Sequence, residues 1–201
     1  MSTILSRARL LCLILSAILL ISQLSTTLQI DEAIAAKPKK PQSTVIVEAD
    51  TEKLPVQVAE MHEAILAAAQ SGRIKELLVP IQWNELRPNF GKIDASDAIP
   101  AFKKLSVDGD GKEILAILTK LLEMPYAVIR QGRDIENNKI YVWPYLAELP
   151  LKKLKPEQDV QLLQIVPRAD YKSMKESGKY SYWRLAIGAD GTWHEFLKPE
   201  R

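Results

Sequence analysis

Two segments near the C-terminus, 180–188 and 192–197, limit the choice of fold because apolar and polar residues alternate in both. A period of two is typical of a strand with one buried face. Asp190 and Gly191 lie between the segments, and Asp-Gly is a favoured two-residue turn. The sequence therefore predicts a C-terminal β-hairpin.

This turn also predicts which side chains of the hairpin share a face, because side chains alternate along a strand. One face is expected to pack against the core and consists of Trp183, Leu185, Ile187, His194 and Phe196. The other face is expected to point outward and consists of Arg184, Ala186, Trp193 and Glu195. On that outward face Arg184 and Glu195 are diagonal and opposite in charge.

A second region of period two precedes this hairpin. Residues 126–130 and 140–145 are expected to be strands joined by a tight turn at Asn137 and Asn138, since Asn tolerates positive φ. Pro144 suits a strand end because proline cannot donate to the ladder. Residues 45–47 are β-branched and indicate a further short strand.

Three regions predict amphipathic helices because their apolar residues recur at helical spacing. The first follows Pro55 and stops near Gly72, and its apolar face is Val58, Met61, Ile65 and Ala69. The second begins with a capping box at 110–113, and its stripe is Ile114, Ile117, Leu118 and Leu121. The third begins at Pro156 and carries Val160, Leu163 and Val166. A further short helix is expected at 169–177.

Residues 79–100 predict a long irregular connection, with Trp83 and Phe90 as apolar anchors. The order of elements predicts an α+β fold. In this fold, N-terminal and central amphipathic helices pack on an antiparallel sheet formed by the two C-terminal hairpins.

The N-terminus predicts export to the bacterial periplasm. Arg7 and Arg9 precede an apolar run at 10–21, which suits a secretory signal and is shorter than the roughly 20 residues of a membrane span. Residues 33–35 match a signal-peptidase site, so cleavage is expected after Ala35. The polar spacer 22–32 is long for a signal peptide, so an uncleaved membrane anchor stays open as the alternative.

Cleavage would divide the chain into a signal peptide at 1–35, a basic proline-containing tether at 36–54 and a single α+β domain at 55–201. Cys12 is the one cysteine, so the mature chain has none, which suits an oxidising compartment. No membrane span is expected after cleavage. A net charge of +2 does not indicate nucleic acid as a partner. Weak contact with anionic surfaces is expected from the tether lysines Lys37, Lys39 and Lys40.

Three stretches resemble an uncharacterised family of exported bacterial proteins. They are Gly132-Arg133-Asp134, the segment YVWPYLAE at 141–148 and the segment WRLAIGADGTW at 183–193. The resemblance covers most of 57–198 and implies no activity. The helix followed by an antiparallel sheet is also similar in architecture to the nuclear-transport-factor-2-like cone fold, and this likeness implies no functional residues.

The familiar catalytic motifs are incomplete in this sequence. His194 and Glu195 begin like a zincin helix, but Lys198 stands where the second His belongs. The Gly-Lys pairs complete no phosphate-binding loop, and a mature chain without Cys excludes thiol catalysis. Residues 108–111 resemble the start of a calcium loop, but Glu113 stands where the loop needs Gly, so helix capping explains them. No metal and no cofactor are expected.

Two function classes follow. The leading prediction is a non-catalytic exported domain that binds an envelope protein or a small apolar ligand. The alternative is a cofactor-independent hydrolase or isomerase in which His194, or His62 on the first helix, acts with a carboxylate in a pocket between sheet and helix. Candidate ligand-binding residues are Tyr182, Trp193 and Arg184, as an exposed aromatic patch, together with Arg133 and Asp134 near the first hairpin turn.

Overall fold

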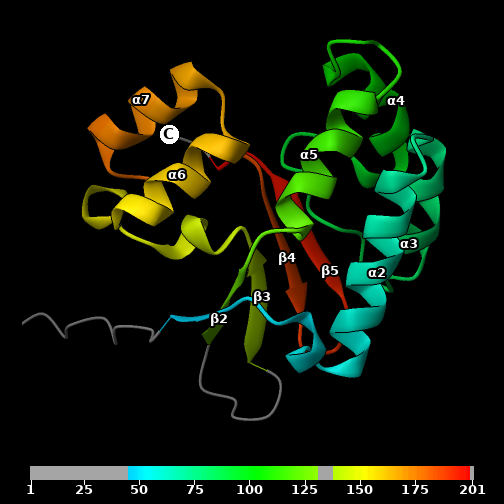
Figure 1. Cartoon of the computed structure of the whole chain (residues 1–201). Helices are drawn as coiled ribbons and strands as arrows, with labels where there is room; N and C mark the ends of the chain where they lie inside the picture. Colours follow the sequence, from blue (N-terminus) through cyan, green and yellow to red (C-terminus); the bar gives the residue numbers. More distant parts are fainter. Residues whose placement is uncertain (1–44, 131–137, 200–201) are drawn as a thin grey trace, which may run out of the picture. The chain divides into compact units, whose positions relative to one another are not determined.

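Five antiparallel strands form one sheet in the order β1-β2-β3-β4-β5, so strands that are consecutive in the sequence are also neighbours in space (Figure 1). The computed structural model describes residues 45–130 and 138–199, which belong to one unit, 42–201. The strands are β1 Ile46–Glu48, β2 Tyr126–Arg130, β3 Lys139–Trp143, β4 Arg184–Gly188 and β5 Trp193–Leu197. The α-helices are α2 Val56–Gln70, α3 Leu78–Gln82, α4 Ala98–Leu105, α5 Lys112–Leu122, α6 Pro156–Ile165 and α7 Arg168–Ser177. The predicted α+β class, with two C-terminal hairpins in the sheet, is confirmed.

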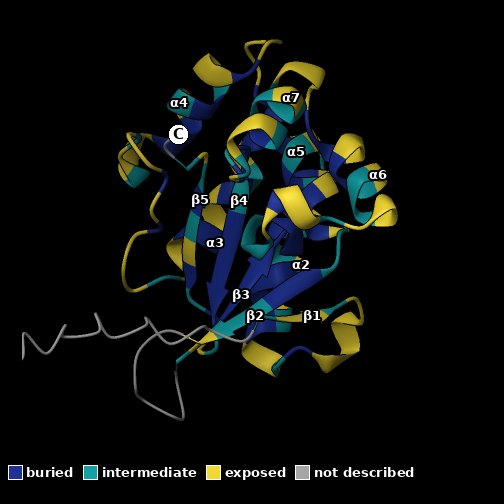
Figure 2. Ribbon diagram, turned by 90° about the vertical axis from the view of Figure 1, so that its left-hand side faces the viewer, coloured by how far each residue is buried: buried dark blue, intermediate teal, exposed yellow. Residues whose placement is uncertain are grey.

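One face of the sheet carries large side chains and packs against α2. The ring of Trp143 on β3 is fully buried and lies 5.3 Å from the rings of His62 on α2 and Tyr126 on β2. Figure 1 shows α2 to α5 together on one side of the sheet, whereas α6 and α7 lie beyond the end where β4 begins. Figure 2 shows that the central strands β3 and β4 are buried along most of their length. The main core therefore lies between the sheet and the α2–α5 layer.

The C-terminal hairpin forms, but its turn is one residue longer than predicted. The Gly191 N–H donates to the Gly188 carbonyl at 2.9 Å, and the Gly188 N–H donates to the Thr192 carbonyl at 2.9 Å. Gly191 has a φ of +84°, as the last position of a three-residue loop requires. Pairing near the turn is therefore displaced, and Trp193 lies opposite Ile187 where His194 was expected.

A β-bulge at His194 restores the predicted register farther from the turn. Leu185 pairs with Phe196 as predicted, whereas His194 pairs with no residue of β4. His194 is exposed, and Trp193 and Phe196 are fully buried. The expectation that His194 faces the core and Trp193 faces outward is therefore wrong, because the longer loop and the bulge each shift the pairing by one residue.

The first hairpin has the predicted strands but a different connection. Arg130 pairs with Lys139, so the residues 131–138 separate the two strands. A two-residue turn at Asn137 and Asn138 would instead pair residues 136 and 139. The predicted tight turn is therefore wrong, and only Asn138 of that pair lies within the described residues.

The three predicted amphipathic helices form at the predicted positions, but the cap of α5 and the packed face of α6 differ from the prediction. In α2 the four predicted apolar residues are buried. In α5 the cap differs: Asp108 and Ser106, rather than Asp110, accept from the Glu113 N–H, and Gly111 occupies the N-cap at φ +90°. In α6 the packed face consists of Leu162 and Ile165, so the predicted packing of Val160 and Leu163, which are exposed, is wrong.

The connection at 79–100 contains most of α3 and the start of α4, neither of which the sequence indicated. Pro100 lies in the first turn of α4, where a missing N–H costs no helical hydrogen bond. Phe90 is buried as expected, but Trp83 is 57% exposed and is not an anchor. Among residues 45–130 and 138–199, no helix is both long and apolar enough to cross a membrane.

Candidate functional site

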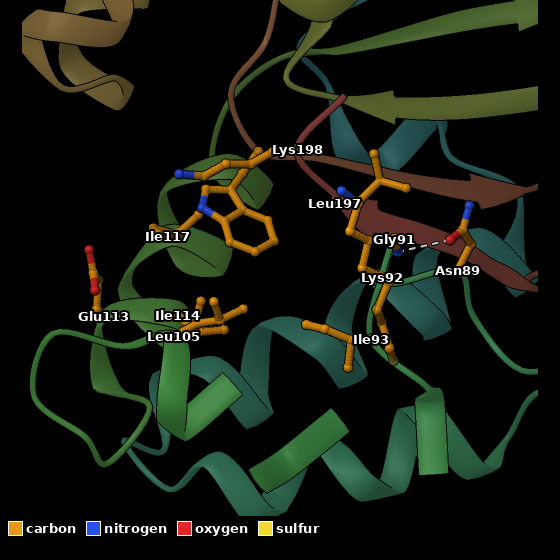
Figure 3. Close-up of a pocket in the computed structure, with 12 residues that line it drawn as sticks. Asn89, Gly91, Lys92, Ile93, Leu105, Glu113, Ile114, Ile117, Leu197 and Lys198 are labelled. Carbon is orange, nitrogen blue, oxygen red and sulfur yellow. Dashed lines mark hydrogen bonds between the residues drawn. The ribbon is translucent and has the colours of Figure 1, made fainter. Parts of the chain in front are cut away.

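An open hollow beside α5 has a volume of about 690 Å³ (Figure 3). This volume lies within the roughly 300–1,000 Å³ typical of ligand sites. Its lining comes from four places: the loop after α3, the end of α4, one face of α5 and the open end of the β4–β5 hairpin, opposite its turn. The lining residues are Asn89, Phe90, Gly91, Lys92, Ile93, Leu105, Glu113, Ile114, Ile117, Trp183, Leu197 and Lys198. We call this hollow the α5 groove.

The loop on one side of the α5 groove is held by the edge of the sheet. The Asn89 N–H donates to the His194 carbonyl at 2.8 Å, and the Asn89 carbonyl accepts from the Phe196 N–H at 3.0 Å. The loop then turns sharply at Gly91, whose φ is +72° and whose N–H donates to the Asn89 side chain at 2.9 Å. These bonds occupy the outer edge of β5 and fix this wall of the groove.

Two aromatic residues of the lining, Phe90 and Trp183, pack against rings of the core. Phe90 contacts Phe102 of α4 and Trp193 of β5, with ring centroids 5.2 and 5.3 Å apart. Trp183 stacks on Phe196 at 4.5 Å with an interplanar angle of 17°. Because Phe90 contacts two buried rings and Trp183 stacks on a third, the apolar surface of the groove is preformed.

A smaller hollow continues along α5 from the groove. Its volume is about 300 Å³, and it shares Glu113 and Ile117 with the α5 groove. Tyr182 and the end of α6 form its other side. Apolar surface therefore extends along α5 on both sides of the Tyr182–Trp183 pair.

Lys198 carries a positive charge at the junction of the two hollows. Its ammonium lies 4.9 Å from the centre of the Tyr182 ring and 5.4 Å from the centre of the Trp183 ring. Burial, and then the Asp170 and Glu113 carboxylates, raise the pKa of Tyr182 to about 12. The Tyr182 phenol is therefore neutral at pH 7, and both rings hold the cation through their faces.

Glu113 supplies a negative charge to the same region, and the backbone already neutralises part of it. Its carboxylate accepts from the Val107 N–H at 2.7 Å, and it lies in the first turn of α5, where the helix dipole favours an acid. Next to it, the Ser106 hydroxyl hydrogen bond and the N–H groups of α5 lower the pKa of Asp108 to about 2 against the effect of burial. This network holds the start of α5 in place.

The two histidines proposed from the sequence lie in different surroundings. His62 is buried and its Nε2 hydrogen-bonds the Leu122 carbonyl at 3.0 Å. His194 lies over Gly188, where any Cβ would clash with its imidazole. Neither histidine lines any of the hollows described here, so the expected pocket with a catalytic His194 is not formed at these hollows.

The residues that the sequence proposed for ligand binding do not form one exposed site. Trp193 is fully buried and Tyr182 is 6% exposed, so the predicted exposed aromatic patch is wrong. Arg184 makes ion pairs at 3.0 Å with Glu195, as its diagonal position predicted, and at 3.1 Å with Glu148. Arg133 and Asp134 lie outside the described residues.

The residues that sequence reasoning missed are those of the α5 groove, above all Lys198, Glu113 and Leu105. Leu105 lies in α4, Glu113 in α5 and Lys198 directly after β5, and no signal in the sequence joins them. In the part of the chain that the structure describes, no cluster of three or more His, Cys, Asp or Glu could hold a metal ion. The arrangement offers apolar surface and a few charges, which suits binding.

The sequence resemblances to an exported family and to the nuclear-transport-factor-2-like fold stay predictions, since no finding tests them. The search for relatives covered protein-family models, curated proteins and solved structures. None of the three comparisons gave a match.

Proposed function

We propose that this chain is a non-catalytic binding domain, exported to the bacterial cell envelope, whose α5 groove holds the apolar part of a ligand. The observation that carries the proposal is the groove itself, at about 690 Å³ and lined mostly by apolar side chains. Such a concave apolar surface with few polar groups is the usual form of a small-molecule site.

The rigidity of the groove supports binding without chemistry. Trp183 and Phe90 are fixed by ring contacts to the core, and Asn89 is fixed by two backbone hydrogen bonds to β5. Preformed walls lower the entropic cost of binding, because less of the protein must be ordered when the ligand enters. The ionisable residues that line the groove are Lys92, Glu113 and Lys198.

A neutral fluorescent probe, N-phenyl-1-naphthylamine, tests this function on the purified full chain. Leu105 lines the groove and is 54% exposed, whereas Leu163 on α6 does not line it and is 51% exposed. The two residues form a matched pair because each substitution removes an equally exposed leucine. Leu105→Gln is expected to weaken probe binding by about threefold or more, and Leu163→Gln is expected to leave it unchanged.

Equal effects of the two variants would contradict the proposal, because probe binding would then not depend on the groove. Unchanged circular dichroism and melting temperature of both variants would show that a loss of binding does not reflect unfolding. A chain that binds no probe at all would also contradict it.

A further inference from the structure

We propose that the ligand of the α5 groove is a single-chain anionic amphiphile, a long-chain carboxylate, with its head group at Lys198 and its tail on the apolar floor. This inference rests on the proposed function, because it names the ligand class for the same groove. Three observations carry it: the place of Lys198, the state of Glu113 and the shape of the apolar surface.

The ammonium of Lys198 is available to an anion. Lys198 is exposed and follows directly after β5, and the structure places its charge over the faces of Tyr182 and Trp183. A cation held by ring faces keeps its N–H donors free to bind a carboxylate in front of it. The rings also fix the position of the charge, since Trp183 is itself stacked on Phe196.

Glu113, the acid of the groove, does not cancel this charge. Its carboxylate already accepts a 2.7 Å hydrogen bond from the Val107 N–H and lies at the positive end of α5. With Glu113 partly compensated by the backbone, the Lys198 ammonium is the group of the groove that an anionic head group would meet.

The floor beside Lys198 suits a hydrocarbon tail. Apolar side chains from α4, α5, β5 and the loop after α3 line the cavity together, and those that reach solvent are Ile93, Leu105, Ile117 and Leu197. Figure 3 shows Ile114, Leu105 and Ile93 on the side of the groove away from Lys198. A ligand with an anionic head at Lys198 would therefore meet apolar surface along its tail.

Three probes with the same twelve-carbon tail test the head group on the purified full chain, below their micelle-forming concentrations. They are dodecanoate, dodecanol and dodecyltrimethylammonium, and their affinities are measured by displacement of N-phenyl-1-naphthylamine. Dodecanoate is expected to bind about tenfold more tightly than dodecanol, as one charge-assisted hydrogen bond allows. Dodecyltrimethylammonium is expected to bind most weakly.

Variants of Lys198 assign the preference to this residue. Lys198→Met is expected to lower dodecanoate affinity about tenfold and leave dodecanol unchanged, and Lys198→Glu is expected to favour the cationic probe. The control is Lys172→Met, an exposed lysine of α7 that does not line the groove, and it is expected to keep the preference of the unmodified chain. Equal binding of dodecanoate and dodecanol, or a preference that survives Lys198→Met, would overturn the inference while the proposed function stands. Binding of none of the probes would remove both.

Discussion

Trp193 lies opposite Ile187 in the last hairpin, and the next residue, His194, is left without a partner on β4. The fully buried indole of Trp193 contacts Phe90 at 5.3 Å, and its Nε1–H donates to the Glu195 carbonyl at 3.1 Å. The backbone N–H of Trp193 donates to the Asn84 side chain at 2.7 Å. One residue of β5 thus joins the sheet, the loop of the α5 groove and the end of α3.

The first prediction concerns this pair of neighbouring residues. Trp193→Ala is expected to lower the free energy of unfolding by about 3–5 kcal/mol, because it leaves a cavity among packed rings. His194→Ala is expected to cost less than about 1 kcal/mol, because the side chain is exposed. Urea denaturation of both variants measures the difference. The reverse order of effects would show that the bulge is absent and that His194 faces the core.

The second prediction separates backbone strain from crowding in the hairpin loop. Gly191 has a φ of +84°, and a Cβ there would lie 2.8 Å from the Gln57 carbonyl oxygen of α2. Gly109 has a φ of +69°, but a Cβ there would meet nothing within 4 Å. Gly109→Ala is expected to cost about 1 kcal/mol from strain alone. Gly191→Ala is expected to cost at least about 1 kcal/mol more, since α2 or the hairpin must move. Equal costs by urea denaturation would show that the hairpin loop does not pack against α2.

The third prediction concerns acid stability at the start of α5. The pKa of Asp108 is about 2 in the fold and 3.8 ordinarily, owing first to the Ser106 hydroxyl. A carboxylate with a lowered pKa stabilises the fold above its ordinary pKa, and this contribution disappears as the pH falls through the folded value. Asp108→Asn is therefore expected to lower the melting temperature at pH 6, and the gap to the unmodified chain is expected to narrow between about pH 4 and pH 2.

The matched control for this pH dependence is Asp110→Asn. Asp110 pairs with the exposed Lys112 at 3.2 Å, and exposed pairs contribute little to stability. The melting temperature of Asp110→Asn is expected to match that of the unmodified chain at pH 6 and at pH 2. A gap for Asp108→Asn that stays constant from pH 6 to pH 2 would contradict the role of its ionisation.

The fourth prediction concerns the N-terminus. Expression in a bacterium with a periplasm is expected to give a soluble periplasmic product. Mass spectrometry of the intact product is expected to show the mass of a chain that starts at Ala36. This follows from the short apolar run at 10–21 and the Ala-Ile-Ala segment at 33–35. A membrane-bound product that keeps Met1 would instead support the uncleaved anchor.

The sequence by itself determined the elements that local periodicity encodes. The apolar residues Val58, Met61, Ile65 and Ala69 recur along one helical face, and all four are buried in α2. The alternation around Asp190-Gly191 correctly predicted the last hairpin and the strand pairing away from its turn, including the pair Leu185–Phe196. Such patterns are visible in the sequence because burial of one face repeats with the period of the element itself.

Tertiary structure decided what depends on contacts between distant segments. The His194 carbonyl at the open edge of β5 accepts from the Asn89 N–H, 105 residues earlier in the chain, and no local pattern in β5 records that neighbour. Leu162 and Leu163 are the same residue type, so composition cannot tell them apart. The way α6 packs buries Leu162 and leaves Leu163 exposed. The α5 groove brings Leu105, Glu113 and Lys198 together from three elements. Local propensity cannot encode such a site, because its residues become neighbours only when the sheet and helices pack.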